Sequence, residues 1–225
     1  MTLYGIGLGP GDPELLTVRG RRLLETVDVV YTPGRLSQRV ARSYVDDDTL
    51  SDLEFPMTRN KGELRTAWKT AAETVASTAR TEEAAFVTLG DPNVYSTFGH
   101  LRRALDRFHP TVPVEVVPGV STVTAFTSAF DVEITAGAEL TLREAAEGDT
   151  PTGPDRMVLF KVTDVPTTHR TLVDAGYEVV YGRRLFMPDA ETIVTRDPSV
   201  LGDRDYYTVA YAEKVGVSDG HSLFE

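Results

Sequence analysis

The chain has 225 residues, of which 41% are hydrophobic, and a formal net charge of −11. This length is enough for one large or two modest hydrophobic cores. The absence of cysteine excludes disulfides, thiolate nucleophiles and cysteine-bound zinc or iron–sulfur clusters. Because no basic stripe offsets the acidic balance, we expect neither nucleic acid nor an anionic membrane as a partner.

The sequence also lacks signals for a membrane, a leader peptide or a metal. No apolar run approaches the roughly 18 residues of a membrane span, and the first twenty residues do not resemble a signal peptide, so we expect a cytoplasmic protein. Four lysines stand beside nineteen arginines, as in proteins from salt-loving microbes. We expect no protein-held metal, because the four histidines are far apart and match no local metal motif: His100, His109, His169 and His221.

The first twenty-five residues predict a strand, a glycine-rich turn and a helix. Residues 2–9 form an apolar run that becomes rich in glycine. Asp12 followed by Pro13 is typical of a helix start, because the aspartate caps free N–H groups and proline needs no hydrogen bond there. We expect the helix to continue to about Glu25.

The glycine-rich turn matches neither common nucleotide motif. A G-x-G-x-x-G pattern taken from Gly5 needs glycine where Pro10 stands, and taken from Gly7 it fails at Asp12. No Gly-Lys-Ser/Thr follows, so the phosphate-binding P-loop pattern fails as well. The turn still indicates close approach of the backbone to a ligand, with tight packing as the alternative.

Strand and helix patterns alternate through residues 27–126, which predicts a parallel sheet covered by helices. Trp68 lies on the clearest helix and is expected in the core rather than as a stacking platform. The predicted strands are 27–32, 53–55, 84–88 and 113–117, after the first at 2–9, and the predicted helices are 38–44, 61–80, 96–108 and 120–126.

The central turn comes directly after the apolar run at 84–88 and contains Gly90, Asp91 and Pro92. In parallel sheets, ligands bind at the carboxyl ends of strands, where loops from neighbouring strands converge. Gly90 permits close backbone approach, and Pro92 sets the direction of the exit. Three strands end in glycine-rich turns, so we expect all three turns at one sheet edge. An ordinary connection is the alternative for any one of them.

Beyond about Asp131 the pattern becomes richer in strands, which predicts a second α/β domain with a mixed sheet. We therefore expect an N-terminal domain of residues 1–118 and a C-terminal domain of residues 119–225. The later strands are expected at 140–142, 157–162, 179–185, 192–194 and 206–211, with one clear helix at 165–174.

Three motifs, in this order and spacing, resemble the tetrapyrrole methylase family: residues 5–17 (GIGLGPGDPELLT), 90–92 (GDP) and 117–121 (VPGVS). These enzymes use S-adenosylmethionine to methylate corrin and sirohaem precursors. The resemblance implies two α/β domains with the cofactor in a cleft between them, a tetrapyrrole substrate and a homodimer. The central turn is most similar to that of members that methylate carbon 20 of precorrin-2 or of its cobalt form, cobalt-factor II.

Carried over residue by residue, the resemblance implies cofactor contacts from the two domains. Those in the first half are Pro10, Leu89, Gly90, Asp91, Val94, Tyr95, Ser121 and Thr122. Lys161 and Ala190 would complete the site from the second half. Gly9 is a substrate candidate in the first turn. Because the substrate carries carboxylates, arginines after strand ends are further candidates, with plain surface charge as the alternative: Arg35, Arg39 and Arg59.

The chemistry implied is an in-line displacement at a sulfonium methyl group, for which alignment outweighs general-base catalysis. The base that removes the ring proton stays open between Asp91, Tyr95 and solvent. Asp91 has an alternative role as a turn residue bonded to its own backbone. Alternative functions are another corrin-ring or uroporphyrinogen methylase, or a nucleotide-binding protein that is not a methylase, either an oxidoreductase or a sensor.

Overall fold

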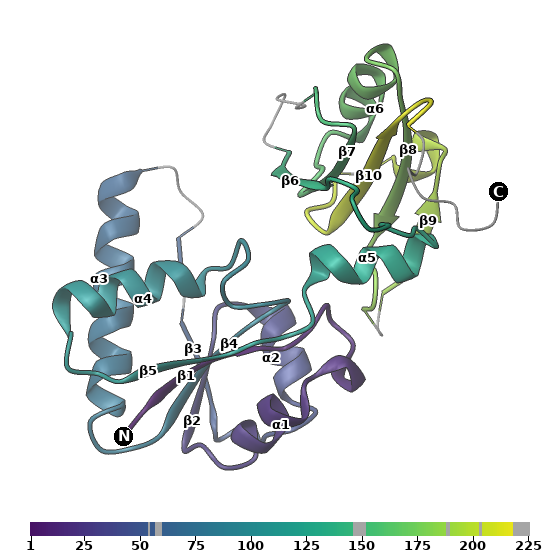
Figure 1. The fold of residues 1–225 in the computed structure, drawn as a ribbon. Helices are drawn as coiled ribbons and strands as arrows, with labels where there is room; N and C mark the ends of the chain where they lie inside the picture. Colours follow the sequence, from purple (N-terminus) through teal and green to yellow (C-terminus); the bar gives the residue numbers. More distant parts are fainter. Residues whose placement is uncertain (54, 57–59, 146–151, 188–189, 203, 218–225) are drawn as a thin grey trace. The chain divides into compact units, whose positions relative to one another are not determined.

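The computed structural model describes residues 1–53, 55–56, 60–145, 152–187, 190–202 and 204–217. Within it, residues 1–122 form one compact unit and the chain from residue 123 onward forms a second (Figure 1). The division into an N-terminal domain of residues 1–118 and a C-terminal domain of residues 119–225 remains a proposal.

The first unit contains a five-stranded parallel sheet in the order β3-β2-β4-β1-β5, as the alternating pattern predicted. All five side chains of the central strand are buried, because helices cover both faces of the sheet. The strands are β1 (Leu3–Gly7), β2 (Val29–Thr32), β3 (Leu50–Asp52), β4 (Ala84–Thr88) and β5 (Val114–Val117).

Helices cover both faces of this sheet (Figure 1). On one face, α3 (Lys61–Thr78) and α4 (Phe98–Phe108) pack together over a core that includes Phe86 and Phe98. On the other, α1 (Val18–Leu24) and α2 (Arg35–Ala41) enclose a second core.

The single helix expected from Asp12 to Glu25 is wrong. Asp12 does accept a hydrogen bond from the Glu14 N–H (2.9 Å), but only the short 3₁₀ helix η1 (Pro13–Leu15) follows. Leu16 is extended, and Thr17 caps a new helix, α1, by accepting from the Gly20 N–H (3.1 Å). The threonine side chain thus competes with continued helix for the backbone donors.

The strand expected at 53–55 is also wrong at Leu53 and Phe55, which lie outside any strand, while residue 54 lies outside the described residues; the strand β3 pairs three residues earlier. Its register places Leu50 beside Val30 and Asp52 beside Thr32. The Thr32 hydroxyl donates to the Asp52 carboxylate, and Gln38 on α2 donates to the same group. Such partners are distant in the sequence and leave no local pattern.

The second unit contains a mixed sheet in the order β6-β7-β10-β8-β9, in which β6 and β7 are parallel and the other pairs antiparallel. The helix at 165–174 matches the expected range, and it packs against β8. The elements of the second unit are α5 (Thr122–Phe130), β6 (Thr141–Glu144), β7 (Arg156–Phe160), α6 (Val165–Asp174), β8 (Tyr177–Arg183), β9 (Ile193–Thr195), η2 (Pro198–Leu201) and β10 (Thr208–Lys214).

Candidate functional site

Three glycine-rich turns meet at the carboxyl edge of the parallel sheet, as predicted. The strands β4, β1 and β5 are neighbours and run in the same direction, so the segments that follow them lie side by side. The Gly90 N–H donates to the Gly9 carbonyl (2.7 Å), and these two residues form an isolated antiparallel bridge. The first and central turns are therefore joined backbone to backbone.

Two further glycines, Gly7 and Gly119, lie where the backbones of the turns are in close contact, and our prediction of site residues missed both. A Cβ atom on Gly7 would lie 2.5 Å from the Gly90 carbonyl oxygen, and one on Gly119 would lie 2.4 Å from the same atom. No side chain fits at either position. Tight packing therefore explains these two glycines, whereas Gly9 and Gly90 have positive φ angles of 77° and 68°.

Asp91 ties the central turn to the turn after β5. One carboxylate oxygen, Oδ1, accepts from the Asn93 N–H (2.8 Å). This bond forms the local turn that the sequence analysis gave as the alternative role of Asp91. The other oxygen, Oδ2, accepts from the Gly119 N–H (3.3 Å). Both oxygens thus have backbone donors, and the carboxylate holds two turns in place.

The rest of the central turn is anchored by Ser96, which our prediction of site residues also missed. Its hydroxyl donates to Thr88 Oγ1 (3.0 Å) at the end of β4 and accepts from the Phe98 N–H (3.1 Å) at the start of α4. Between these anchors, Tyr95 has a positive φ of 50° and a side chain that is 54% exposed. The turn therefore presents an aromatic side chain to solvent from a fixed backbone.

The other candidates of the first unit lie around these turns. Pro10 is buried in the first turn, while Leu89 and Val94 are half-buried in the central one. Thr122 is next to the central turn, because a Cβ atom on Gly90 would lie 3.3 Å from the Thr122 nitrogen. Ser121 precedes it and is half-buried.

Lys161 and Ala190 belong to the second unit, so their place in a site with the glycine turns stays a proposal. The Lys161 ammonium donates to Glu144 Oε1 (2.8 Å) and lies 5.2 Å from the centre of the Tyr206 ring. Burial alone would lower the pKa of Lys161, but contacts with Glu144 and Tyr206 raise it overall. The Ala190 N–H donates to the Met187 carbonyl (3.2 Å).

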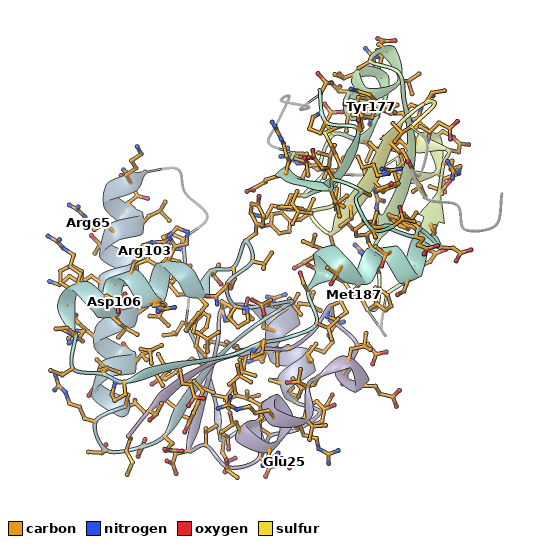
Figure 2. The ribbon with its side chains drawn as sticks, viewed as in Figure 1. Glu25, Arg65, Arg103, Asp106, Tyr177 and Met187 are labelled. Carbon is orange, nitrogen blue, oxygen red and sulfur yellow. The ribbon has the colours of Figure 1, made fainter. Side chains whose placement is uncertain are left out.

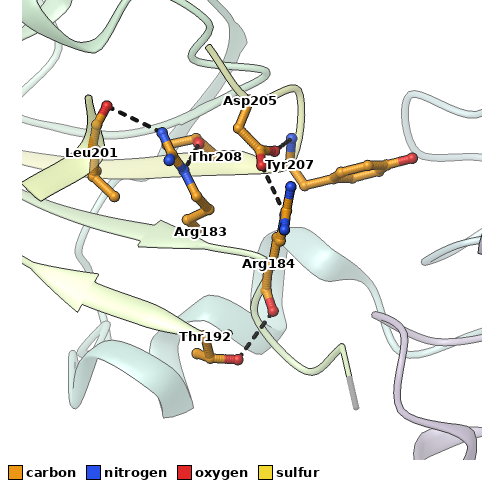
Figure 3. Close-up of polar contacts among 7 residues, drawn as sticks. All are labelled: Arg183, Arg184, Thr192, Leu201, Asp205, Tyr207 and Thr208. Carbon is orange, nitrogen blue, oxygen red and sulfur yellow. Dashed lines mark hydrogen bonds and ion pairs between the residues drawn. The ribbon is translucent and has the colours of Figure 1, made fainter. Parts of the chain in front are cut away.

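A polar network follows the end of β8 in the second unit (Figure 3). The Arg184 guanidinium donates to Asp205 Oδ2 (2.8 Å), and Oδ1 of this buried carboxylate accepts from the Tyr207 N–H (2.7 Å). The buried Arg183 side chain donates to Thr208 Oγ1 (3.3 Å) and to the Leu201 carbonyl (3.2 Å). These contacts join the connection before β10 to the end of β8.

Two of the three arginines proposed for substrate carboxylates lie on α2, which begins at the carboxyl edge of β2. Arg35 and Arg39 are both exposed there. Arg59, the third, lies outside the described residues. The structure therefore puts Arg35 and Arg39 in the helix after a strand that neighbours β4, with Arg35 at its first position.

The assembled edge offers backbone groups and an exposed tyrosine. Within the described ranges, no group of three or more histidine, aspartate or glutamate side chains is arranged to hold a metal ion. None of the helices in this part of the chain is both long and apolar enough to cross a membrane. The geometry suits a reaction in which a bound ligand is positioned mainly by main-chain contacts.

Comparison with known proteins identifies relatives of this chain. The family model for Tetrapyrrole (Corrin/Porphyrin) Methylases matches residues 2–198. A probable cobalt-precorrin-2 C(20)-methyltransferase from Methanocaldococcus jannaschii is 34% identical over 61% of this chain and 60% of its own length. The cobalt-precorrin-2 C(20)-methyltransferase of Salmonella typhimurium is 32% identical over 71% of this chain and 72% of its own length.

Solved structures show the same fold. A cobalt precorrin-4 methyltransferase matches with a TM-score of 0.72 and 26% identity, over 94% of each chain. A uroporphyrin-III C-methyl transferase from Thermus thermophilus, complexed with S-adenosylhomocysteine, matches with a TM-score of 0.67 and 22% identity, over 96% of this chain and 98% of its own. These findings favour the methylase interpretation over an oxidoreductase or a sensor.

Proposed function

Because this chain belongs to the tetrapyrrole (corrin/porphyrin) methylase family, we propose that it is an S-adenosylmethionine-dependent C-methyltransferase of cobalamin biosynthesis. The proposed acceptor is carbon 20 of precorrin-2 or cobalt-factor II. One observation carries this choice: the relative at 32% identity is named a cobalt-precorrin-2 C(20)-methyltransferase, and the relative at 34% identity is named a probable one.

The residues of the first unit fit an S-adenosylmethionine molecule, which supplies an activated methyl group on its sulfonium sulfur. Gly90 has a positive φ of 68° and no side chain, so a ligand can come close to the backbone of the central turn. Half-buried Leu89 and Val94 provide apolar contact, and exposed Tyr95 provides an aromatic ring. In this proposal Pro10, Asp91 and Ser121 complete the first-unit wall, and Lys161 and Ala190 contribute from the second unit.

The chain's main task in this reaction is alignment. The departing thioether needs no proton, and an electron-rich ring carbon needs no activation by a cysteine or histidine. Holding the two reactants in line accounts for about 7–11 kcal/mol of barrier in well-oriented systems. A general base contributes less, roughly 10²–10⁴-fold. A fixed set of turns that cannot accommodate even a methyl group at Gly7 or Gly119 suits this role.

The ring proton must still leave carbon 20. The Asp91 carboxylate already accepts from the Asn93 and Gly119 N–H groups, so it is the weaker candidate for a base. Tyr95 and solvent are the better ones. Arg35 and Arg39, and Arg59 beyond the described residues, are proposed to bind substrate carboxylates.

We also propose a homodimer that works in the cytoplasm, as the resemblance and the sequence led us to expect. Size-exclusion chromatography with light scattering tests the oligomeric state. A monomeric mass at micromolar concentration would contradict the dimer.

Isothermal titration with S-adenosylhomocysteine, and separately with NAD, tests the cofactor class. We expect micromolar binding of the first and none of the second. Incubation with ¹³C-methyl S-adenosylmethionine and either precorrin-2 or cobalt-factor II then tests the reaction, and NMR locates the label. Label at carbon 20 supports the proposal, whereas absence of transfer to both acceptors would overturn it.

A second candidate is a methyltransferase acting on precorrin-4. It is favoured by the cobalt precorrin-4 methyltransferase structure, which covers 94% of this chain at 26% identity. The same labelling assay with precorrin-4 and cobalt-precorrin-4 discriminates the two. Transfer to these acceptors, without transfer to precorrin-2 or cobalt-factor II, would select the second candidate.

A further inference from the structure

The solvent-facing side of α3 and α4 is basic, although the chain as a whole has a net charge of −11. Together the two helices contain six lysines and arginines against three aspartates and glutamates. Arg65 on α3 and Arg103 on α4 are both exposed and lie on the same side of this helix pair (Figure 2). The sign of the local charge is thus opposite to that of the rest of the molecule.

The arginines of this surface are available for a ligand. Among the described residues, no carboxylate lies within ion-pair distance of Arg65, Arg103 or Arg107. On the opposite face of the sheet, by contrast, Arg21 pairs with Glu25 at 2.7 Å. The chain has more carboxylates than basic groups. A group of arginines without carboxylate partners is therefore unexpected for a surface that serves only solubility.

Aromatic rings lie among these cations. Trp68 on α3 stacks on Phe55, with ring centres 3.9 Å apart, and on His100 of α4, with ring centres 5.2 Å apart. His100 is exposed, and the Arg103 guanidinium is 3.1 Å from its Nδ1. Trp68 therefore packs against the core, as expected. It also stacks on the exposed ring of His100, which we did not expect.

A second ring of the same surface is also flanked by cations. Phe108 at the end of α4 is 37% exposed, with the Lys69 ammonium and the Arg107 guanidinium each 5.7 Å from its centre. Flat apolar rings with cations beside them favour a ligand that is itself flat and negatively charged, since stacking and charge-assisted hydrogen bonds then act together.

We propose that this surface, formed by Arg65, Trp68, His100, Arg103 and Phe108, is a docking site for a planar polycarboxylate tetrapyrrole. The proposal rests on the proposed function, because that function supplies a substrate of this chemistry. The surface adjoins the edge that carries the glycine turns, since α4 begins shortly after the central turn. Binding here raises the local concentration of a polyanion that the acidic remainder of the chain repels.

Trp68 is the chain's single tryptophan, so its fluorescence can follow the binding of uroporphyrin, a stable polycarboxylate tetrapyrrole. The test variant is Arg65→Glu combined with Arg103→Glu, and the matched control is Arg80→Glu, an exposed arginine just beyond the far end of α3. We expect the Kd to rise at least about tenfold in the test variant and to stay unchanged in the control. Equal Kd values in all three proteins would overturn the proposal.

The contribution of the stacked ring is tested separately. His100→Ala removes the exposed ring, whereas His100→Phe keeps an aromatic ring without its nitrogen atoms. We expect weaker uroporphyrin binding in the first and recovery in the second. Loss of affinity in both variants, or in neither, would contradict a stacking role.

Two further measurements separate this proposal from the proposed function. S-adenosylhomocysteine titration of the Arg65→Glu/Arg103→Glu variant should give the wild-type Kd, which shows that the variant is folded. Its KM for the tetrapyrrole should rise with kcat unchanged. If wild-type protein binds uroporphyrin through these residues but transfers no methyl group, the function fails and the docking site stands. If methylation proceeds with a wild-type KM in the variant, the docking site fails and the function stands.

Discussion

The carboxyl edge of the parallel sheet and the end of β8 in the mixed sheet are stabilised by different means. At the first, backbone meets backbone: Gly90 bonds to Gly9, and Gly119 has no room for a side chain. At the second, charged side chains make the connections, as in the pair formed by Arg184 and Asp205. The first arrangement is sensitive to added volume, and the second to lost charge.

The largest effect is expected from Gly90→Val. At its φ of 68°, a residue with a Cβ atom costs about 1–2 kcal/mol, and the valine side chain would also meet Thr122. We expect S-adenosylhomocysteine binding to be lost in calorimetric titration, while circular dichroism shows a folded protein.

Gly137→Val is the matched control for Gly90→Val. Gly137 has a φ of 88°, but no atom lies within 4 Å of the added Cβ position. The Gly137→Val variant therefore has the same kind of backbone strain without the crowding, and it should bind the cofactor normally. Normal binding by Gly90→Val would remove the central turn from the site.

The next effect is expected in the second unit, from Asp205→Ala. This change removes the carboxylate from Arg184 and leaves the Tyr207 N–H without its acceptor, which should cost about 2 kcal/mol of unfolding free energy. Asp205→Asn can still accept from Tyr207 and should cost less. Urea denaturation measures both, and a loss below about 0.5 kcal/mol in the alanine variant would show that the network adds little.

A smaller effect is expected from Asp91→Asn. An amide oxygen can keep the bond from the Asn93 N–H, but the amide nitrogen cannot accept from Gly119. We expect a loss of about 1 kcal/mol in stability and about fivefold weaker S-adenosylhomocysteine binding. Asp91→Ala removes both contacts and should be worse. Equal affinities for the wild type and Asp91→Asn would mean that the bond between the turns is unimportant.

The smallest effect is expected in the pH dependence of stability, through protonation of His100 in the first unit. Although His100 is exposed as a whole, its ring is partly shielded from water where it stacks on Trp68; this partial desolvation, and then the nearby Arg103, hold the pKa of His100 below its usual value near 6.5. As the pH falls below about 6.5, the unfolded chain therefore binds a proton that the folded one does not, and stability decreases. Urea denaturation from neutral to mildly acidic pH should show a smaller decrease for His100→Asn. Parallel curves would contradict this.

Local sequence patterns determined most element types and where the candidate site lies. The apolar run at 84–88 became β4, and the helix expected at 165–174 became α6, both with the expected bounds. The order of strands and helices implied a parallel sheet, and strands of one direction bring their carboxyl ends to one edge. The convergence of the three turns followed from these patterns, because each depends on residues close together in the chain.

Only the tertiary structure decided which atoms meet across those elements. The bond from Gly119 to Asp91, the pair of Arg184 with Asp205 and the stacking of Trp68 on His100 join residues that are far apart in the sequence. The register of β3 and the break at Leu16 likewise depended on partners in space or on competing caps. Periodicity and capping signals report the local backbone, whereas these contacts arise when whole elements pack together.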